Sequence, residues 1–252
     1  MITTSWDDGH PLDLRVADLL ARHGLRGTFY IPRSFEAGTM TPAEIRGLSD
    51  RGFEVGAHTL DHVDLKTVDE SMALHEIGGS KAWVEDLTGR PCRMFCPPKG
   101  RFNRRDLRLA QDCGFDGLRT VELMSLDYPR FGPGILVMPT SVQAHPHEWS
   151  AYARNGLRRL APHNLWRSII FGRSSDWTGT AAALVDRVVK RGGVFHLWGH
   201  SWELQEYGQW RRLEEVLRLL SQYVDGAPAL TNGEVCGNVL SRQHVVHRPV
   251  SA

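Results

Sequence analysis

Short apolar runs and amphipathic stretches alternate along the chain. Apolar or β-prone runs that end at a turn signal predict strands. The expected strands cover residues 2–6, 25–32, 53–57, 93–97, 115–118, 135–138 and 194–200. Apolar residues at helical spacing, often after a proline or a capping residue, predict helices between them. The expected helices cover residues 11–24, 42–50, 67–87, 104–113, 179–191 and 207–223.

This order of strand then helix predicts a mostly parallel sheet, which at 252 residues favours closure into a β/α barrel. We expect one catalytic barrel over residues 1–240 and a polar C-terminal tail over residues 241–252. Such barrels carry their chemistry at the carboxyl ends of the strands. Several candidate residues fall at those ends: Asp7, Asp8, His58, Pro97 and His200.

Composition narrows the classes of partner. A net charge of +1 favours neither nucleic acid nor a membrane surface. No apolar run approaches the length of about 18 residues that a membrane span needs. The first residues lack the basic start and apolar core of a signal peptide, so a cytoplasmic location is expected. Four cysteines are too sparse for a disulfide scaffold, and we expect buried thiols. The oligomeric state stays open.

Asp7 and Asp8 are adjacent carboxylates at the end of the first expected strand, followed by Gly9. Neighbouring side chains in a strand point to opposite faces, but a turn at Gly9 would let both face one cavity. One carboxylate could then bind a metal while the other acts as a general base. Considered alone, the segment is more typical of a turn that leads into a helix.

His58 and His62 form the second candidate group. A separation of four residues puts two imidazoles on one face of a helical turn, with Cα atoms about 6 Å apart. Both could then bind one ion. Two surface histidines in a polar loop are the alternative. Two histidines and a carboxylate, with a spare carboxylate beside them, are typical of a metal-dependent hydrolase.

These two groups resemble the first two motifs of the polysaccharide deacetylase family. The matching segments are Ser5-Trp6-Asp7-Asp8-Gly9 and His58-Thr59-Leu60-Asp61-His62. The resemblance implies a distorted (β/α) barrel with about seven parallel strands. It also implies that Asp7 is the general base and that Asp8, His58 and His62 bind a divalent metal, usually Zn²⁺.

The third and fourth motifs of that family are less well matched. The third reads Phe95-Cys96-Pro97-Pro98-Lys99-Gly100-Arg101-Phe102-Asn103. Cys96 stands where the family has an arginine that orients the base aspartate, and Arg101 or Lys99 are possible substitutes. The Lys99 backbone N–H is a candidate oxyanion donor. The fourth motif, whose aspartate pairs with the acid histidine, has no clear equivalent between Gly117 and Pro133.

The last expected strand offers two histidines for the fifth motif. By alternation His196, Trp198 and His200 share a face, and His200 is closest to the carboxyl end. We therefore expect His200 to be the general acid and His196 to be a hydrogen-bonded core residue. Trp198 and Trp202 could wall a sugar pocket, although tryptophans at strand ends are more often plain packing. Two further histidines, His145 and His147, are expected in a loop.

The function predicted from these residues is metal-dependent removal of an N-acetyl group from an amino sugar. A lipid-linked or nucleotide-linked sugar in surface polysaccharide (O-antigen or capsule-like) synthesis is the hypothesis for its substrate. One alternative is a hydrolase of a small amide on the same scaffold. Another is a non-catalytic sugar-binding protein that retained the metal ligands, suggested by Cys96 and the missing fourth motif. A site of this composition could also hold Fe(II), but the second aspartate and His200 favour hydrolysis.

Overall fold

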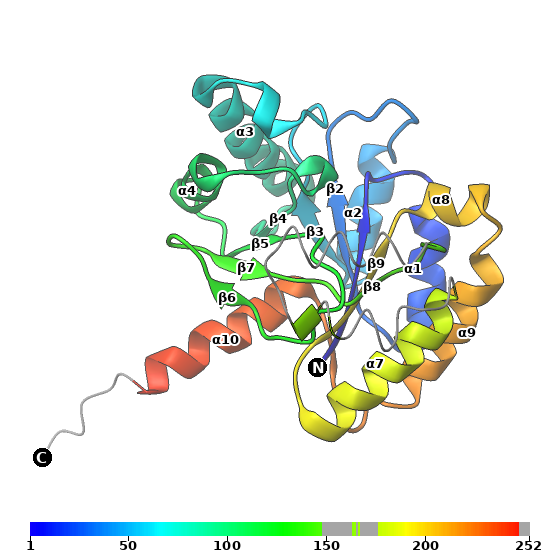
Figure 1. The fold of residues 1–252 in the computed structure, drawn as a ribbon. Coiled ribbons are helices and arrows are strands. Elements are labelled where there is room, and N and C mark those ends of the chain that lie inside the picture. The colour runs from blue at the N-terminus through cyan, green and yellow to red at the C-terminus, as the bar shows by residue number, and fades with distance from the viewer. Residues whose placement is uncertain (148–162, 165, 167–175, 247–252) are drawn as a thin grey trace, which may run out of the picture.

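The computed structural model describes residues 1–147, 163, 164, 166 and 176–246, and strands and helices alternate along most of them (Figure 1). The strands are β1 (Ile2–Asp7), β2 (Thr28–Ile31), β3 (Glu54–Ala57), β4 (Met94–Phe95), β5 (Gly117–Arg119), β6 (Arg130–Phe131), β7 (Leu136–Met138), β8 (Val142–Gln143), β9 (Phe195–Gly199) and β10 (Ala229–Leu230). The α-helices are α1 (Asp13–Arg22), α2 (Pro42–Asp50), α3 (Glu70–Thr88), α4 (Arg104–Asp112), α7 (Trp177–Arg191), α8 (Ser201–Glu206), α9 (Trp210–Ser221) and α10 (Asn232–Val246). Two 3-10 turns, η1 (Leu65–Thr67) and η2 (Pro98–Gly100), lie in the loops.

One curled sheet organises the molecule. Its strand order is β6-β7-β5-β4-β3-β2-β1-β9-β8, and β10 adds to β1. All pairs are parallel except β6 with β7. Residues 139–141 alone separate β7, which pairs with β5, from β8, which pairs with β9. An interrupted strand thus joins the two edges of the sheet, as the predicted distorted barrel requires. Pro139 lies at the interruption, where a residue without an N–H cannot continue the ladder.

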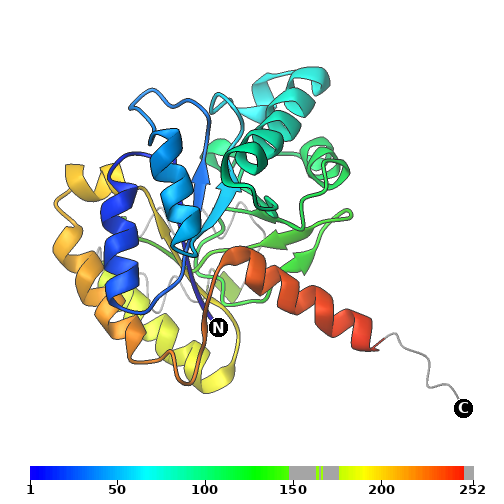
Figure 2. The same ribbon diagram turned by 180° about the vertical axis from the view of Figure 1, so that it is seen from behind.

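The core follows the expected pattern. Every residue of β1, β2 and β9 is buried, and helices cover the outside of the curled sheet (Figures 1 and 2). The helix expected over residues 207–223 forms α9, where Leu213, Leu217 and Leu220 are buried and Trp210, expected on the same face, is half-buried. The neighbours of α9 are α7 and α1, and burial of an apolar stripe against such neighbours supplies most of the stability of an amphipathic helix.

Helix starts were predicted with mixed success. The capping box at Thr41 is confirmed, because the Thr41 N–H donates to Glu44 Oε2 at 2.7 Å and the Glu44 N–H donates to Thr41 Oγ1 at 3.4 Å. The start at Thr67 is wrong. Asp69 caps α3 by accepting from the Met72 N–H at 2.8 Å, because its carboxylate competes successfully for that amide. The short helix α8 was not predicted.

The C-terminal segment differs from the expected tail. Helix α10 extends through residues 241–246, which were predicted to lack an element, and residues 247–252 lie outside the described residues. Val235 and Cys236 at its start are buried with Tyr30 and Met94, whereas its far end projects from the barrel (Figure 2). Cys92, Cys96 and Cys236 are buried free thiols, as expected, and Cys113 is half-buried.

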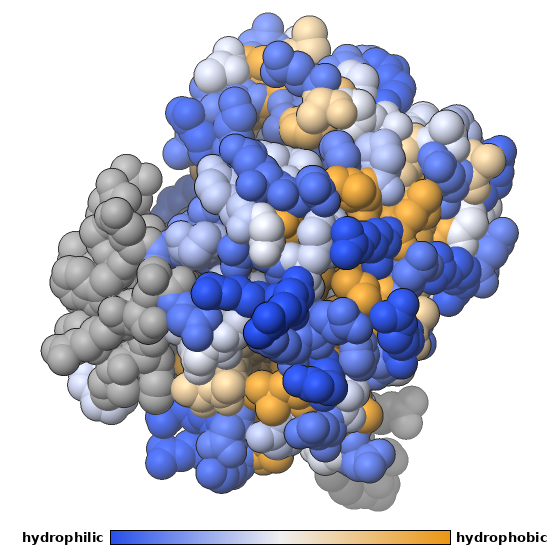
Figure 3. Space-filling model, turned by 90° about the vertical axis from the view of Figure 1, so that its right-hand side faces the viewer, coloured by the Kyte–Doolittle hydropathy of each residue, from blue (hydrophilic) through white to orange (hydrophobic). Residues whose placement is uncertain are grey.

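The outer surface is mostly hydrophilic on the face that carries α8 and α9, with small separate hydrophobic patches (Figure 3). Charged side chains on the outer faces of these helices are solvated, which leaves their apolar faces for the core. Among the described residues, no helix combines the length and the hydropathy that crossing a bilayer would require.

Candidate active site

The candidate site residues meet at the carboxyl ends of the parallel strands, as predicted. Asp7 ends β1, His58 directly follows β3, Arg119 ends β5 and His200 directly follows β9. Asp7, His58 and His200 line a cavity of about 540 Å³, and Arg119 is buried behind its wall. The residues that line it are Asp7, Asp8, Phe35, His58, His62, Lys99, Gly100, Val121, Leu123, Gln143, His147, Trp198, His200, Trp202 and Glu203.

Both aspartates line this one cavity because the chain turns sharply at the end of β1. Asp8 has a φ of 78° and Gly9 a φ of 63°, so the backbone enters the left-handed region directly after the strand. A Cβ on Gly9 would lie 2.5 Å from Ile31 Cγ2, so no larger residue fits there without a shift. The turn interpretation and the functional interpretation of Asp7-Asp8-Gly9 are therefore compatible.

Three donor atoms converge within the cavity. Asp8 Oδ1 lies 3.4 Å from His58 Nε2 and 3.2 Å from His62 Nε2. These are the residues whose ligand atoms could hold a metal ion together. Two imidazoles and one carboxylate form a donor set typical of catalytic zinc sites, which keep a further position for water or substrate.

The loop that carries the two histidines is not the helical turn that their spacing suggested. Residues 58–64 are irregular, and Thr59 and His62 have φ values of 61° and 53°. Glu76, buried on α3, accepts the N–H groups of Leu60 and Asp61 at 2.8 and 3.0 Å. In a helical turn these two N–H groups would donate to backbone carbonyls, and here the Glu76 carboxylate accepts them instead. The loop can therefore keep the irregular path on which the two imidazoles converge.

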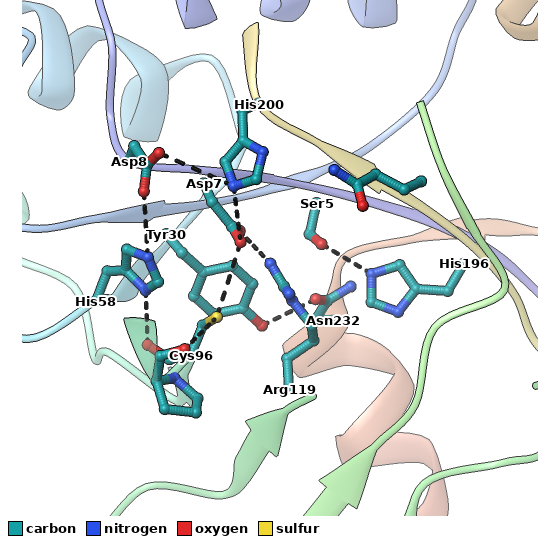
Figure 4. Close-up of polar contacts among 12 residues, drawn as sticks. Ser5, Asp7, Asp8, Tyr30, His58, Cys96, Arg119, His196, His200 and Asn232 are labelled. Carbon is teal, nitrogen blue, oxygen red and sulfur yellow. Dashed lines mark hydrogen bonds and ion pairs between the residues drawn. The ribbon is translucent and has the colours of Figure 1, made fainter. Parts of the chain in front are cut away.

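Further hydrogen bonds orient two of the three donor groups, His58 (Figure 4) and Asp8. His58 Nδ1 lies 2.6 Å from the Cys96 carbonyl oxygen, which leaves His58 Nε2 facing Asp8. The Trp202 indole N–H donates to Asp8 Oδ2 at 2.9 Å, so that Asp8 Oδ1 faces the imidazoles. Contacts of this kind fix ligand orientation in metal sites. Burial raises the pKa of Asp8, but hydrogen bonds from His58 and His62 and the charges of His200 and His58 together lower it more, so the carboxylate is ionised.

A second group, Asp7 with His58 and Cys96, is also close enough to share an ion. Two features argue against a metal there. Arg119 already pairs with Asp7, and burial raises the pKa of the Cys96 thiol, which disfavours the thiolate that a metal requires. The donor set around Asp8 therefore fits a metal better.

Arg119 forms a buried ion pair with Asp7 Oδ1 (Figure 4). The arginine that contacts Asp7 is therefore Arg119, and neither of the expected substitutes, Arg101 and Lys99, takes this place. Arg101 instead pairs with Asp64 at 2.9 Å. The register explains why Arg119 can replace an arginine at position 96. Phe95 of β4 pairs with Leu118 of β5, so the next residues, Cys96 and Arg119, stand side by side on neighbouring strands. The guanidinium thus reaches Asp7 from one strand further along the sheet.

The surroundings of Arg119 suit a buried cation. Its side chain is 0% exposed, and its guanidinium carbon lies 4.8 Å from the ring centre of Trp198 and 5.2 Å from that of Tyr30. Burial lowers the pKa of Arg119, but Asp7, Cys96 and Tyr30 together raise it more, with Asp7 contributing most among them. The result is a permanent positive charge beside one oxygen of Asp7, with Asp7 Oδ2 left toward the cavity.

His200 faces both aspartates from the opposite wall. His200 Nε2 lies 4.0 Å from Asp7 Oδ2 and 3.9 Å from Asp8 Oδ2. His200 Nδ1 lies 2.7 Å from Glu203 Oε2. Glu203, on α8, is therefore the carboxylate that pairs with His200, the contact that the fourth motif was expected to supply. Burial lowers the pKa of His200, but Glu203 and the two aspartates raise it above its usual range.

Gln143 and His147 continue the hydrogen-bond chain that begins with His200 and Glu203. The Gln143 amide donates to Glu203 Oε2 at 3.0 Å, and its oxygen lies 2.7 Å from His147 Nε2. Burial lowers the pKa of His147 to about 4, so this ring is neutral at pH 7 and donates to Gln143. His147 lies in a loop, as expected, and lines the cavity.

His196 lies apart from the cavity, as expected of a core residue. It is 1% exposed, its Nε2 lies 2.9 Å from Ser5 Oγ, and its Nδ1 lies 3.1 Å from the Pro139 carbonyl oxygen. Burial lowers its pKa to about 3. The neutral ring is thus satisfied on both nitrogens, which leaves His200 as the histidine that faces Asp7 and Asp8.

Replacement of Glu203 should change the pH dependence of any activity that needs protonated His200. Because Glu203 raises the pKa of His200, Glu203→Gln should move the alkaline limb of the kcat profile to lower pH and reduce kcat about 10-fold above neutrality. Glu206→Gln, on the exposed face of α8, is the matched control. An unchanged profile in Glu203→Gln would contradict this orientation of His200.

Sequence reasoning missed Arg119 and Glu76 and gave no role to Glu203. A signal for Arg119 existed, since a charged residue directly follows the apolar expected strand 115–118, at the edge where the chemistry was expected. Glu76 had none, because its partners are backbone amides in a distant loop.

Comparison with known proteins agrees with the motif resemblance. Residues 1–118 match the model of a family described as polysaccharide deacetylase. The peptidoglycan-N-acetylmuramic acid deacetylase PdaA of Bacillus subtilis is 28% identical over 102 residues, which are 40% of this chain and 38% of that protein. The peptidoglycan-N-acetylglucosamine deacetylase of Bacillus cereus is 24% identical over 116 residues, which are 45% of this chain and 42% of that protein. The chain thus matches less than half the length of either relative.

Solved structures extend the likeness to the whole fold. The Xyl-CE4 domain of a multidomain xylanase from the hindgut metagenome of Trinervitermes trinervoides has a TM-score of 0.59 at 14% identity. The match covers 94% of this chain and 90% of that one. At such low identity the likeness establishes the fold alone, and it confirms the predicted distorted barrel.

Proposed function

We propose that this chain, which belongs to the polysaccharide deacetylase family over residues 1–118, hydrolyses the N-acetyl group of an amino sugar with a divalent metal, expected to be Zn²⁺. The observation that carries the proposal is the convergence of Asp8, His58 and His62 between two groups suited to proton transfer, Asp7 and His200. A bound metal would polarise the amide carbonyl and activate water.

The protein's own groups divide the proton transfers. Asp7 Oδ1 is occupied by Arg119, so Oδ2, which faces the cavity, takes the proton of the attacking water. His200 is held through Nδ1 by Glu203, so its Nε2 delivers a proton to the departing nitrogen. The Lys99 backbone N–H, in the cavity wall, is proposed to donate to the oxyanion. Acetate and a free amine are the products.

The lining favours a sugar over a smaller amide. Aromatic faces from Phe35, Trp198 and Trp202 line a cavity with room for more than one ring. The relatives named above are described as acting on peptidoglycan. We propose an N-acetylated sugar of surface polysaccharide synthesis for this chain, and the cytoplasmic location expected from the sequence stays a prediction.

The two reasons for considering a non-catalytic binding protein no longer apply. This alternative was suggested by Cys96 and by the missing fourth motif, and Arg119 and Glu203 make the contacts expected of the absent groups. A protein that only binds sugar needs neither a paired base nor an oriented histidine.

Release of acetate tests the proposal. The protein, stripped of metal with a chelator and reloaded with Zn²⁺, is assayed against peptidoglycan, N-acetylglucosamine oligomers and nucleotide-linked N-acetyl sugars. Acetate should appear with at least one of them, disappear on chelation and return on metal addition, because the metal would supply the polarisation of the carbonyl and the activation of water. Metal binding without acetate release from any substrate would favour the binding-protein alternative.

A further inference from the structure

The formal charges that line the cavity are paired, with one exception. The pairs are Asp7 with Arg119, Asp8 with His58 and His62, and Glu203 with His200. Lys99 lines the same cavity and is exposed. In the part of the chain that the structure describes, its ammonium group forms no ion pair or hydrogen bond. A cation in this position is available to a bound ligand.

The backbone at Lys99 is unusual for such a side chain. Its φ of 59° and ψ of 10° lie in the left-handed region, where residues other than glycine and asparagine are disfavoured. Strained residues of this kind gather at functional sites, where the surrounding structure maintains them. The observed strain at the wall of the cavity is therefore a reason to look for a binding role.

The neighbouring residues keep Lys99 in this place. Pro97 and Pro98 have restricted φ angles and are buried. Gly100 has a φ of 61° and packs so closely that a Cβ there would lie 2.3 Å from Val121 Cγ2. A change in the loop conformation would break these contacts, so the backbone of Lys99 is held at one position beside the cavity. Such preorganisation reduces the entropy lost on binding.

The walls around this cation are largely apolar. Phe35, Val121, Leu123, Trp198 and Trp202 all line the cavity. A ligand that fills it displaces water, and the attraction between Lys99 and an anion is then stronger than it would be on an open surface. A charge-assisted contact here would also set the orientation of the ligand.

We infer that Lys99 binds a carboxylate or phosphate of the substrate, so that the preferred substrate is an anionic N-acetylamino sugar. This inference rests on the proposed function and deepens it. The anion has two possible sources, a carboxylate on the sugar itself, such as an ether-linked lactyl group, or the phosphate of a nucleotide-linked or lipid-linked sugar. The shared chemistry is a single anionic group within reach of the ammonium.

Matched probes separate the anion from the rest of the sugar. The probes are an N-acetylglucosamine tetramer, the same tetramer bearing O-lactyl carboxylates, its lactyl-amide analogue, and UDP-linked N-acetylglucosamine. Acetate release is measured with the metal-loaded protein, and binding is measured by calorimetry with the metal-free protein. We expect about a 10-fold preference for an anionic probe over its neutral analogue, and a smaller one at high salt. A preference for the O-lactyl tetramer would identify a sugar carboxylate as the anion, and a preference for UDP-linked N-acetylglucosamine would identify a phosphate.

Lys99→Gln should remove this preference by raising KM about 10-fold for the anionic probe relative to its neutral analogue, and Lys99→Glu should reverse it. Both variants keep a side chain at the same backbone conformation. Arg101→Gln is the control, because Arg101 pairs with Asp64. Equal preference in the wild type and in Lys99→Gln, by either measurement, would overturn the inference. Absence of acetate release overturns the proposed function separately, since binding still reports on Lys99.

Discussion

Asp7→Asn should lower kcat for acetate release by about 10³-fold, because general base catalysis contributes about 10²–10⁴ and an amide cannot accept the proton. Asp7 ends β1 with one oxygen paired to Arg119 and the other facing His200 across 4.0 Å. Asparagine has nearly the same shape and keeps an oxygen that can accept from Arg119. The substitution therefore removes the base with little change in packing.

Metal binding distinguishes loss of the base from loss of the site. Asp8, His58 and His62 are unchanged in Asp7→Asn, so Zn²⁺ affinity measured by calorimetry should stay within a few-fold of the wild type. Asp8→Asn is the comparison, in which both affinity and activity should fall, since Asp8 Oδ1 faces both imidazoles. Full activity in Asp7→Asn on an identified substrate would show that the base lies elsewhere.

Arg119→Met should reduce both stability and kcat. The ion pair is buried, with Arg119 0% and Asp7 4% exposed at the side chain. Removing one partner of a buried pair leaves the other charge without compensation and costs about 3–5 kcal/mol. Methionine retains packing between Tyr30 and Trp198. We expect kcat to fall about 100-fold, because Asp7 Oδ2 would no longer be held toward the water.

A rescue separates positioning of Asp7 from general destabilisation. Because Cys96 and Arg119 are register neighbours, Cys96→Arg in the Arg119→Met background returns a guanidinium to the position typical of the family, and should recover part of kcat. Arg105→Met is the control. Arg105 pairs with buried Asp106 on α4, so its loss should reduce the free energy of unfolding and leave kcat unchanged. Loss of stability without loss of kcat in Arg119→Met would refute the positioning of Asp7.

The barrel was predictable because its signals are local. Apolar runs of four to eight residues mark strands in any context, and helices are marked by apolar spacing and caps over one or two turns. The details of turns were less predictable. The separation of His58 and His62 indicated a helical turn, yet Glu76, from another helix, supplies the carboxylate that holds an irregular loop. A local pattern carries no information about such a partner.

For this protein, the sequence by itself determined the alternation of elements, the carboxyl-end positions of Asp7, Asp8, His58 and His200, and the position of His200, rather than His196, nearest the end of its strand. Those follow from chain order and from alternation along single strands. Only the tertiary structure decided that Arg119 pairs with Asp7, that residues 136–143 close the sheet, and that Glu203 orients His200. The reason is physical: register between neighbouring strands and the angle at which a helix leaves a strand depend on packing across the whole barrel, and no local period encodes them.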